Sequence, residues 1–143
     1  MEKYYSTRNT NDRVSFSTGV TRGLSPDGGL YVPESFTNID IYDEKYLKMS
    51  YQELAVDILS NFLDGYTKEE VTTFVSEAYG DNFETKDIVP VKTCDKVNFL
   101  ELFRGPTLAF KDMALQILPK FMVAAARKEG ITDEIVVLTA TSG

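Results

Sequence analysis

Two stretches in the first half of the chain repeat apolar residues at the three- and four-residue spacing of one helix face. In each stretch, a serine or threonine is followed three residues later by glutamate, and a glycine comes after the last apolar residue. These residues are typical of a capping box at the start of a helix and a left-handed stop at its end. The two apolar faces are Tyr51, Leu54, Ala55, Ile58, Leu59 and Phe62, between Ser50 and Gly65, and Val71, Phe74, Val75, Ala78 and Tyr79, between Thr67 and Gly80. The pattern predicts a helical hairpin whose apolar faces pack within their own domain.

The residues before this hairpin predict a short helix, a turn and a strand. Residues 14–20 suit a helix that ends at Gly23, because glycine takes the left-handed conformation easily. Residues 25–29 contain a proline, an aspartate and two glycines, which are typical of a tight turn. Residues 30–33 suit a short strand, and Pro33 predicts a sheet edge or a strand end because proline has no N–H to donate.

The polar residues 81–87 separate this part from a second part with a different pattern. Residues 88–91 and 97–103 are predicted to be strands around a turn at residues 94–96. Residues 113–129 have a helical composition, but Pro119 removes a backbone hydrogen bond and predicts a break near Leu118. The apolar run at residues 135–138 is typical of a buried parallel strand.

The order strand, helix, strand predicts an α/β fold with a right-handed crossover. We therefore expect a small N-terminal module of helices and short strands at residues 1–80. An incomplete second domain is expected at residues 81–143, whose sheet has only begun where the sequence stops.

Composition and charge narrow the classes of function. The chain has 143 residues, a net charge of −7, no histidine, no tryptophan and one cysteine, Cys94. The negative charge argues against nucleic acid as a partner. Without histidine, a zinc site and the Ser-His and Cys-His catalytic pairs are not expected. No apolar stretch is long enough to cross a bilayer and no secretory signal is evident, so we expect a cytoplasmic protein without a metal or membrane partner.

The residues that suggest chemistry surround Lys111, between a predicted strand and a predicted helix, where ligands bind in open α/β sheets. Leu108, Ala109 and Phe110 form an apolar wall before the lysine, and such a wall favours the unprotonated, nucleophilic amine. Asp112 acts in the opposite direction, since a neighbouring carboxylate favours the ammonium form. The spacing is compatible with a lysine that forms a Schiff base, and an ordinary surface lysine is the alternative.

A second candidate follows the predicted strand at residues 135–138. The small and hydroxylated residues 139–143 could hold a carboxylate or phosphate with backbone N–H groups and hydroxyls. An ordinary turn between strand and helix is the alternative interpretation.

Three segments taken together resemble the N-terminal part of the threonine synthases: residues 25–33 (SPDGGLYVP), 105–112 (GPTLAFKD) and 139–143 (TATSG). These are pyridoxal-phosphate enzymes of the tryptophan-synthase β-like fold, also called fold type II. The resemblance covers the whole chain in order, and the motif around the lysine is specific. It implies that Lys111 forms the aldimine with pyridoxal 5'-phosphate and that Phe110 belongs to the cofactor site.

The same resemblance implies a substrate site. Thr141, Ser142 and Gly143 match the start of the loop that holds the carboxylate of the substrate. Arg104 stands where the family usually has histidine, and its cation could assist an anionic phosphate.

The activity implied is that of a carbon-oxygen lyase that converts O-phospho-L-homoserine and water to L-threonine and phosphate, the last step of threonine biosynthesis. Because the sheet is unfinished, we expect the 143-residue chain alone to be an inactive fragment. Its exposed sheet edges could pair with a second copy. The alternatives are a non-catalytic folding or interaction domain, and a pyridoxal-phosphate lyase of the same fold that acts on another amino acid.

Overall fold

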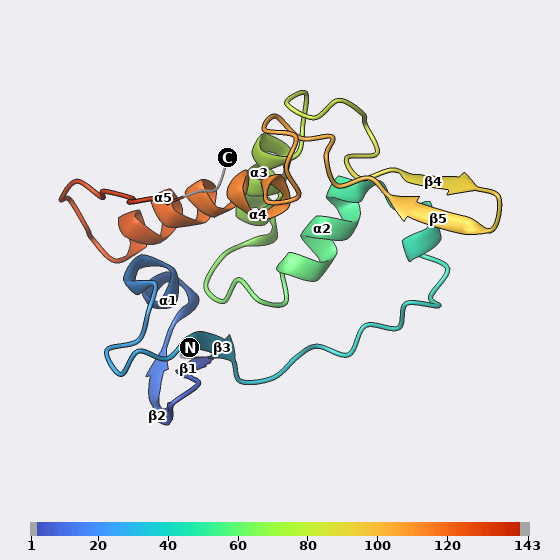
Figure 1. Cartoon of the computed structure of the whole chain (residues 1–143). Coiled ribbons are helices and arrows are strands. Elements are labelled where there is room, and N and C mark those ends of the chain that lie inside the picture. Colours follow the sequence, from blue (N-terminus) through green and yellow to red (C-terminus); the bar gives the residue numbers. More distant parts are fainter. Residues whose placement is uncertain (1–2, 141–143) are drawn as a thin grey trace.

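A computed structural model describes residues 3–140 of the chain (Figure 1). The elements in chain order are β1 (Tyr4–Ser6), β2 (Asn9–Val14), α1 (Phe16–Arg22), β3 (Tyr31–Pro33), the 3-10 turn η1 (Tyr46–Lys48), α2 (Tyr51–Leu59), α3 (Lys68–Ala78), β4 (Val91–Cys94), β5 (Val97–Leu100), α4 (Asp112–Leu115) and α5 (Leu118–Lys128). A long extended segment connects β3 with η1, and the β4–β5 hairpin projects away from the helices (Figure 1).

The N-terminal strands form a small antiparallel sheet in the order β2-β1-β3. Tyr4 pairs with Val14 of β2 on one side and with Pro33 of β3 on the other. The strand that ends in proline is thus an edge strand, as the sequence predicts, because the missing N–H of Pro33 costs least at an edge.

The predicted turn at residues 25–29 is held by Asp27. Its carboxylate accepts hydrogen bonds from the Gly29 N–H at 2.7 Å and from the buried Ser6 hydroxyl at 2.8 Å. The Gly29 bond is the main reason that the pKa of Asp27 lies below its usual range. A side chain at position 29 would collide with the Ser6 hydroxyl, so the turn requires glycine there.

Both helices of the predicted hairpin form, and both begin with a capping box. Their ends differ from the prediction, because α2 ends at Leu59, before Phe62 and Gly65, and Gly80 after α3 does not have a positive φ. The Ser50 side chain accepts the Glu53 N–H while Glu53 accepts the Ser50 N–H, and Thr67 and Glu70 repeat this arrangement. Each box satisfies two backbone donors that the first turn of a helix leaves free.

The predicted break in the last helix is also confirmed. Helix α4 ends at Leu115, and α5 begins at Leu118 with Pro119 in its first turn. Proline suits this position because its missing N–H would have no partner in the first turn of a helix.

The strands of the second part differ from their predicted form. Residues 88–91 are predicted to be a strand, but β4 begins only at Val91, and Ile88 is buried with a positive φ of 61°. Strands β4 and β5 pair antiparallel in a hairpin, around the turn predicted at residues 94–96. Residues 135–138 form no strand, because a parallel strand needs sheet neighbours and residues 3–140 provide none for them.

The hydrophobic core lies between α2, α3 and α5. It consists of Val56, Leu63, Val71, Val75, Ala78, Tyr79, Phe83, Ile88, Ile117 and Phe121. Phe121 of α5 contacts the rings of Phe16 in α1 and Phe74 in α3, with centroids 5.5 and 5.8 Å apart. The core therefore crosses residue 80, and a domain boundary after that residue stays a prediction.

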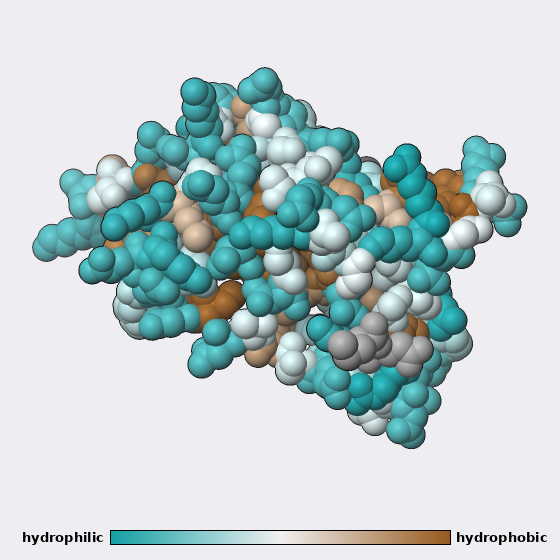
Figure 2. All heavy atoms as spheres, turned by 180° about the vertical axis from the view of Figure 1, so that it is seen from behind, coloured by the Kyte–Doolittle hydropathy of each residue, from teal (hydrophilic) through white to brown (hydrophobic). Residues whose placement is uncertain are grey.

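None of the helices within residues 3–140 has the length and apolar character that a membrane crossing requires. On the face shown in Figure 2, hydrophobic side chains reach the surface at several places between hydrophilic ones.

Candidate functional site

Lys111 lies in the last position before helix α4. Its carbonyl accepts the N–H groups of Ala114 and Leu115, at 3.0 and 2.8 Å, so its backbone already belongs to the first turn of the helix. Its side chain is exposed and forms no ion pair with any other residue between 3 and 140. The amine is therefore available to react with a ligand.

The apolar residues before the lysine are at the surface. Phe110 is 64% exposed and Leu108 is 71% exposed, and Leu108 has a positive φ of 61°. This conformation is unfavourable for a bulky residue, and it occurs where the chain turns before Lys111. The wall predicted from the sequence thus stands beside the lysine as an open apolar surface, on which a flat aromatic ligand could lie.

A free amine beside exposed apolar side chains fits the chemistry of pyridoxal phosphate, whose aldehyde reacts with a lysine and whose ring is aromatic. Of the residues predicted to hold this cofactor, Lys111 and Phe110 are adjacent in the turn. Thr141, Ser142 and Gly143, predicted to hold the substrate, lie outside the described residues.

The Asp112 carboxylate makes its hydrogen bonds within its own turn. Its side chain is completely buried, and its carboxylate accepts hydrogen bonds from the Thr107 N–H at 2.9 Å and from Gln116 at 3.2 Å. The carboxylate is thus used to fix the turn rather than to form an ion pair with the lysine.

Arg104 is held by two carboxylates. Its guanidinium donates to Glu101 through Nε at 2.9 Å and Nη2 at 2.6 Å, and to Glu84 through Nη1 at 2.7 Å. These bonds, that to Glu84 most, raise the pKa of Arg104, which remains a cation. They use three of the five N–H donors of the guanidinium, so two remain for another acceptor.

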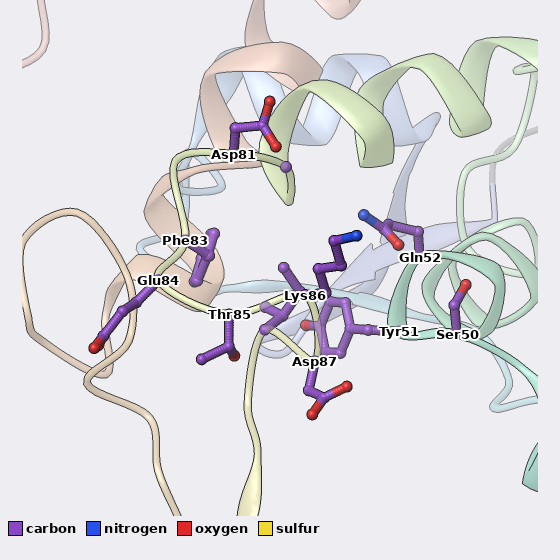
Figure 3. A pocket seen from close by; sticks show the side chains of 11 residues that line it. Ser50, Tyr51, Gln52, Asp81, Phe83, Glu84, Thr85, Lys86 and Asp87 are labelled. Carbon is purple, nitrogen blue, oxygen red and sulfur yellow. The ribbon is translucent and has the colours of Figure 1, made fainter.

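A hollow of about 580 Å³ lies between the start of α2 and the loop that follows α3 (Figure 3). Ser50, Tyr51 and Gln52 from the start of α2 stand on one side, and the loop that follows α3 stands on the other. Glu84, which bonds Arg104, belongs to that loop and lines the hollow, whereas none of the residues 104–112 lines it.

Sequence reasoning missed two contacts at this site. Tyr79 is predicted only as part of an apolar helix face, yet its hydroxyl donates to the carbonyl of Met113, two residues after the lysine, at 2.6 Å. The polar segment at residues 81–87 also contains Glu84, which forms an ion pair with Arg104. A tyrosine on a face whose other side chains carry no polar atom is the one available signal, since a buried tyrosine hydroxyl usually has a partner.

Comparison with known proteins identifies the family. Residues 3–79 match the family described as "Threonine synthase N terminus". The chain is 36% identical, over 99% of its length, to a threonine synthase of Methylobacillus glycogenes, and it spans 31% of that protein.

Two solved structures resemble the chain closely. One is described as a threonine synthase from Brucella melitensis with pyridoxal phosphate bound, with a TM-score of 0.81 and 34% identity over 91% of this chain and 28% of that one. The other is a threonine synthase from yeast, with a TM-score of 0.80 and 28% identity over the same shares. The predicted fold class is thereby confirmed, and the chain belongs to the threonine synthase family, of which it represents the N-terminal part.

Proposed function

We propose that this chain is the N-terminal part of an enzyme that converts O-phospho-L-homoserine and water to L-threonine and phosphate. The observation that supports this most is the turn at Lys111, where a free lysine amine stands beside exposed apolar side chains in a chain of this family. The relative from Brucella melitensis, described as bound to pyridoxal phosphate, supports the same cofactor here.

Lys111 would hold the cofactor through its amine, and Phe110 would contact it from the same turn. The cofactor supplies an electron sink for the carbanions of an amino-acid substrate. The Lys111 amine, when it is not attached to the cofactor, is a base that can move protons at the reacting carbons. No ion pair with a residue between 3 and 140 competes for this amine.

Arg104 has a supporting place in this proposal. Glu84 and Glu101 fix its guanidinium, and the two N–H groups that they leave can donate to a phosphate oxygen. The loop that begins with Thr141, Ser142 and Gly143 would hold the carboxylate of the substrate. These assignments follow the resemblance of the motifs and rest on it.

The first test uses the full-length protein that contains this chain, reconstituted with pyridoxal phosphate. We expect phosphate release and L-threonine formation from O-phospho-L-homoserine, and we expect borohydride reduction to fix the cofactor on the peptide that contains Lys111. Lys111→Ala should lose both the visible absorption of the bound cofactor and the activity.

The matched control is Lys92→Ala, since Lys92 is another exposed lysine and lies on the hairpin strand β4. It should keep the absorption and the activity. Cofactor fixed on a lysine other than Lys111 would contradict the site assignment. Turnover of a different amino acid in place of O-phospho-L-homoserine would favour another lyase of the same fold.

We further propose that the 143-residue chain forms no threonine by itself and associates with a second copy. Its exposed apolar residues support association, above all those at positions 135–138. The cytoplasmic location expected from the sequence stays a prediction.

A further inference from the structure

The turn that carries Lys111 is held by a buried carboxylate directly after the lysine. Oδ2 of Asp112 accepts the Thr107 N–H, and Oδ1 accepts the Gln116 side-chain amide. An added Cβ at Gly105 would lie 2.5 Å from Oδ2 of Asp112, so the glycine lets the chain pass close to the carboxylate. Burying a carboxylate is unfavourable unless it is hydrogen-bonded, and these bonds therefore fix the loop against the start of α4.

A chain of side-chain hydrogen bonds connects this carboxylate with the end of α3. The Gln116 carbonyl oxygen accepts from the Asn82 amide at 3.2 Å, and the Asn82 carbonyl oxygen accepts the Gly80 N–H at 3.0 Å. Every group in the chain donates in the same direction, toward Asp112. At its end each oxygen of the Asp112 carboxylate accepts one donor, Oδ2 from Thr107 and Oδ1 from Gln116.

A second contact reaches the chain after the lysine, at Met113. The Tyr79 ring is 4% exposed and packs edge-on against Tyr51, with ring centroids 5.1 Å apart, while its hydroxyl donates to the Met113 carbonyl at 2.6 Å. Burial, with a smaller effect of Tyr51, raises the pKa of Tyr79. The hydroxyl therefore stays protonated and remains a donor through neutral and mildly alkaline pH.

We propose that Asp112 and Tyr79 are positioning residues that hold the backbone before and after Lys111, at Thr107 and at Met113, with the end of helix α3 as their common support. A lysine that must reach one atom of a cofactor gains from a fixed backbone, because precise placement lowers the barrier to reaction. The N-terminal module then serves the site by supporting the lysine turn. The consequence for catalysis rests on the proposed role of Lys111.

A purely structural role makes a different prediction from a positioning role. If the two residues only stabilise the fold, their loss lowers the free energy of unfolding and speeds amide exchange throughout the chain. If they position the lysine, exchange increases within residues 105–117 first, since sub-global opening is local.

The main test is Tyr79→Phe in the full-length protein, with Tyr4→Phe as its control. Tyr4 lies in the same module, and its hydroxyl donates to the carbonyl of Phe62 at 2.7 Å, so each variant loses one hydrogen bond of the same kind. We expect amide exchange within residues 105–117 to become about fivefold faster in Tyr79→Phe, as the loss of one hydrogen bond implies, and to stay unchanged in Tyr4→Phe.

A second pair of variants tests the carboxylate. Asp112→Asn should speed exchange in the same residues, because an amide places a donor against Thr107 or Gln116. Asp12→Asn is its control, since the carboxylate of Asp12 on strand β2 also accepts two bonds, from Ser25 at 2.7 Å and Tyr31 at 3.3 Å. If Asp112→Asn fails to fold, Tyr79→Phe still tests the proposal, because this variant retains the aromatic ring.

With cofactor bound, a spectroscopic readout separates this proposal from the proposed function. We expect the pH at which the visible absorption of the cofactor changes to shift in Tyr79→Phe and not in Tyr4→Phe. Unchanged exchange at residues 105–117 in Tyr79→Phe, or an equal increase in both tyrosine variants, would overturn the positioning role. Failure of the unaltered protein to attach the cofactor at Lys111 would overturn the proposed function instead, and the exchange result would still decide whether Asp112 and Tyr79 hold the turn.

Discussion

Helix α3 and the segment at residues 135–138 contain similar apolar residues but have opposite surroundings. Val71 and Val75 of α3 are fully buried, whereas Val136 is 72% exposed and Leu138 is 91% exposed. A helix satisfies its backbone hydrogen bonds within itself, so α3 forms and needs only one apolar face covered. A parallel strand takes its hydrogen bonds from neighbouring strands, and residues 3–140 provide none beside this segment.

Hydrophobicity alone therefore does not decide whether a segment is buried. The first half of the chain closes a core around α2 and α3, and it draws in α5 from the second half through Phe121. The hairpin β4–β5 and residues 135–138 keep their apolar side chains at the surface. Residues 135–138 thus have no neighbouring strand among residues 3–140.

The largest effect is expected at the point where the two halves share the core. Phe121→Ala should lower the free energy of unfolding by roughly 3–5 kcal/mol, because it removes a buried ring from between Phe16 and Phe74. Chemical denaturation measures this. Phe99→Ala, at an exposed position of the hairpin, is the control and should cost less than about 1 kcal/mol. Equal losses would mean that α5 is not part of a core shared with the N-terminal half.

A smaller effect is expected from the cap of α3. Thr67→Ala removes the side chain that accepts the Glu70 N–H, and it should cost about 1 kcal/mol of stability in the same denaturation experiment. Thr72→Ala is the control, since Thr72 is exposed in the middle of the same helix. Alanine favours helix there, so stability should stay the same or rise by up to about 0.5 kcal/mol. A loss at position 72 as large as that at 67 would contradict the capping role.

The smallest effect on stability is expected in the exposed segment. Leu138→Ser should change the free energy of unfolding by less than about 0.5 kcal/mol, because the leucine is almost fully exposed. It should weaken association of the 143-residue chain with a second copy, as measured by sedimentation over a range of concentrations. Unchanged association would remove this segment from the proposed contact.

Much of the fold can be predicted from local patterns. The capping boxes at Ser50 and Thr67, the turn at residues 25–29 and the break before Pro119 all depend on residues that are close in sequence. The motif around Lys111 is likewise local, and its resemblance to the threonine synthases is the basis for proposing this lysine as the reactive residue. The final strand at residues 135–138 is predicted from apolar character alone, and it fails in the described chain because its hydrogen-bond partners must come from elsewhere.

The surroundings of the lysine show the limit of such prediction. From the sequence, Asp112 is a neighbour that favours the ammonium form of Lys111, but in the structure its carboxylate turns inward to Thr107 and Gln116. Arg104 is predicted to face a substrate phosphate, and the structure adds Glu84, twenty residues away, as its partner. The partners of Asp112 and Arg104 cannot be predicted from sequence spacing, because they depend on which groups the folded chain brings within hydrogen-bond distance.

The sequence by itself determined the helices with their caps, the N-terminal turn, the motif that contains Lys111 and the resemblance to the threonine synthases. Their causes lie within a few residues, in backbone hydrogen bonds, side-chain caps and the stiffness of proline. Only the tertiary structure decided that Phe121 packs on Phe16, that Tyr79 and Asp112 hold the lysine turn, and that residues 135–138 stay uncovered. These contacts join residues far apart in the chain. They form only where the stabilising interactions of the whole fold offset the loss of chain entropy.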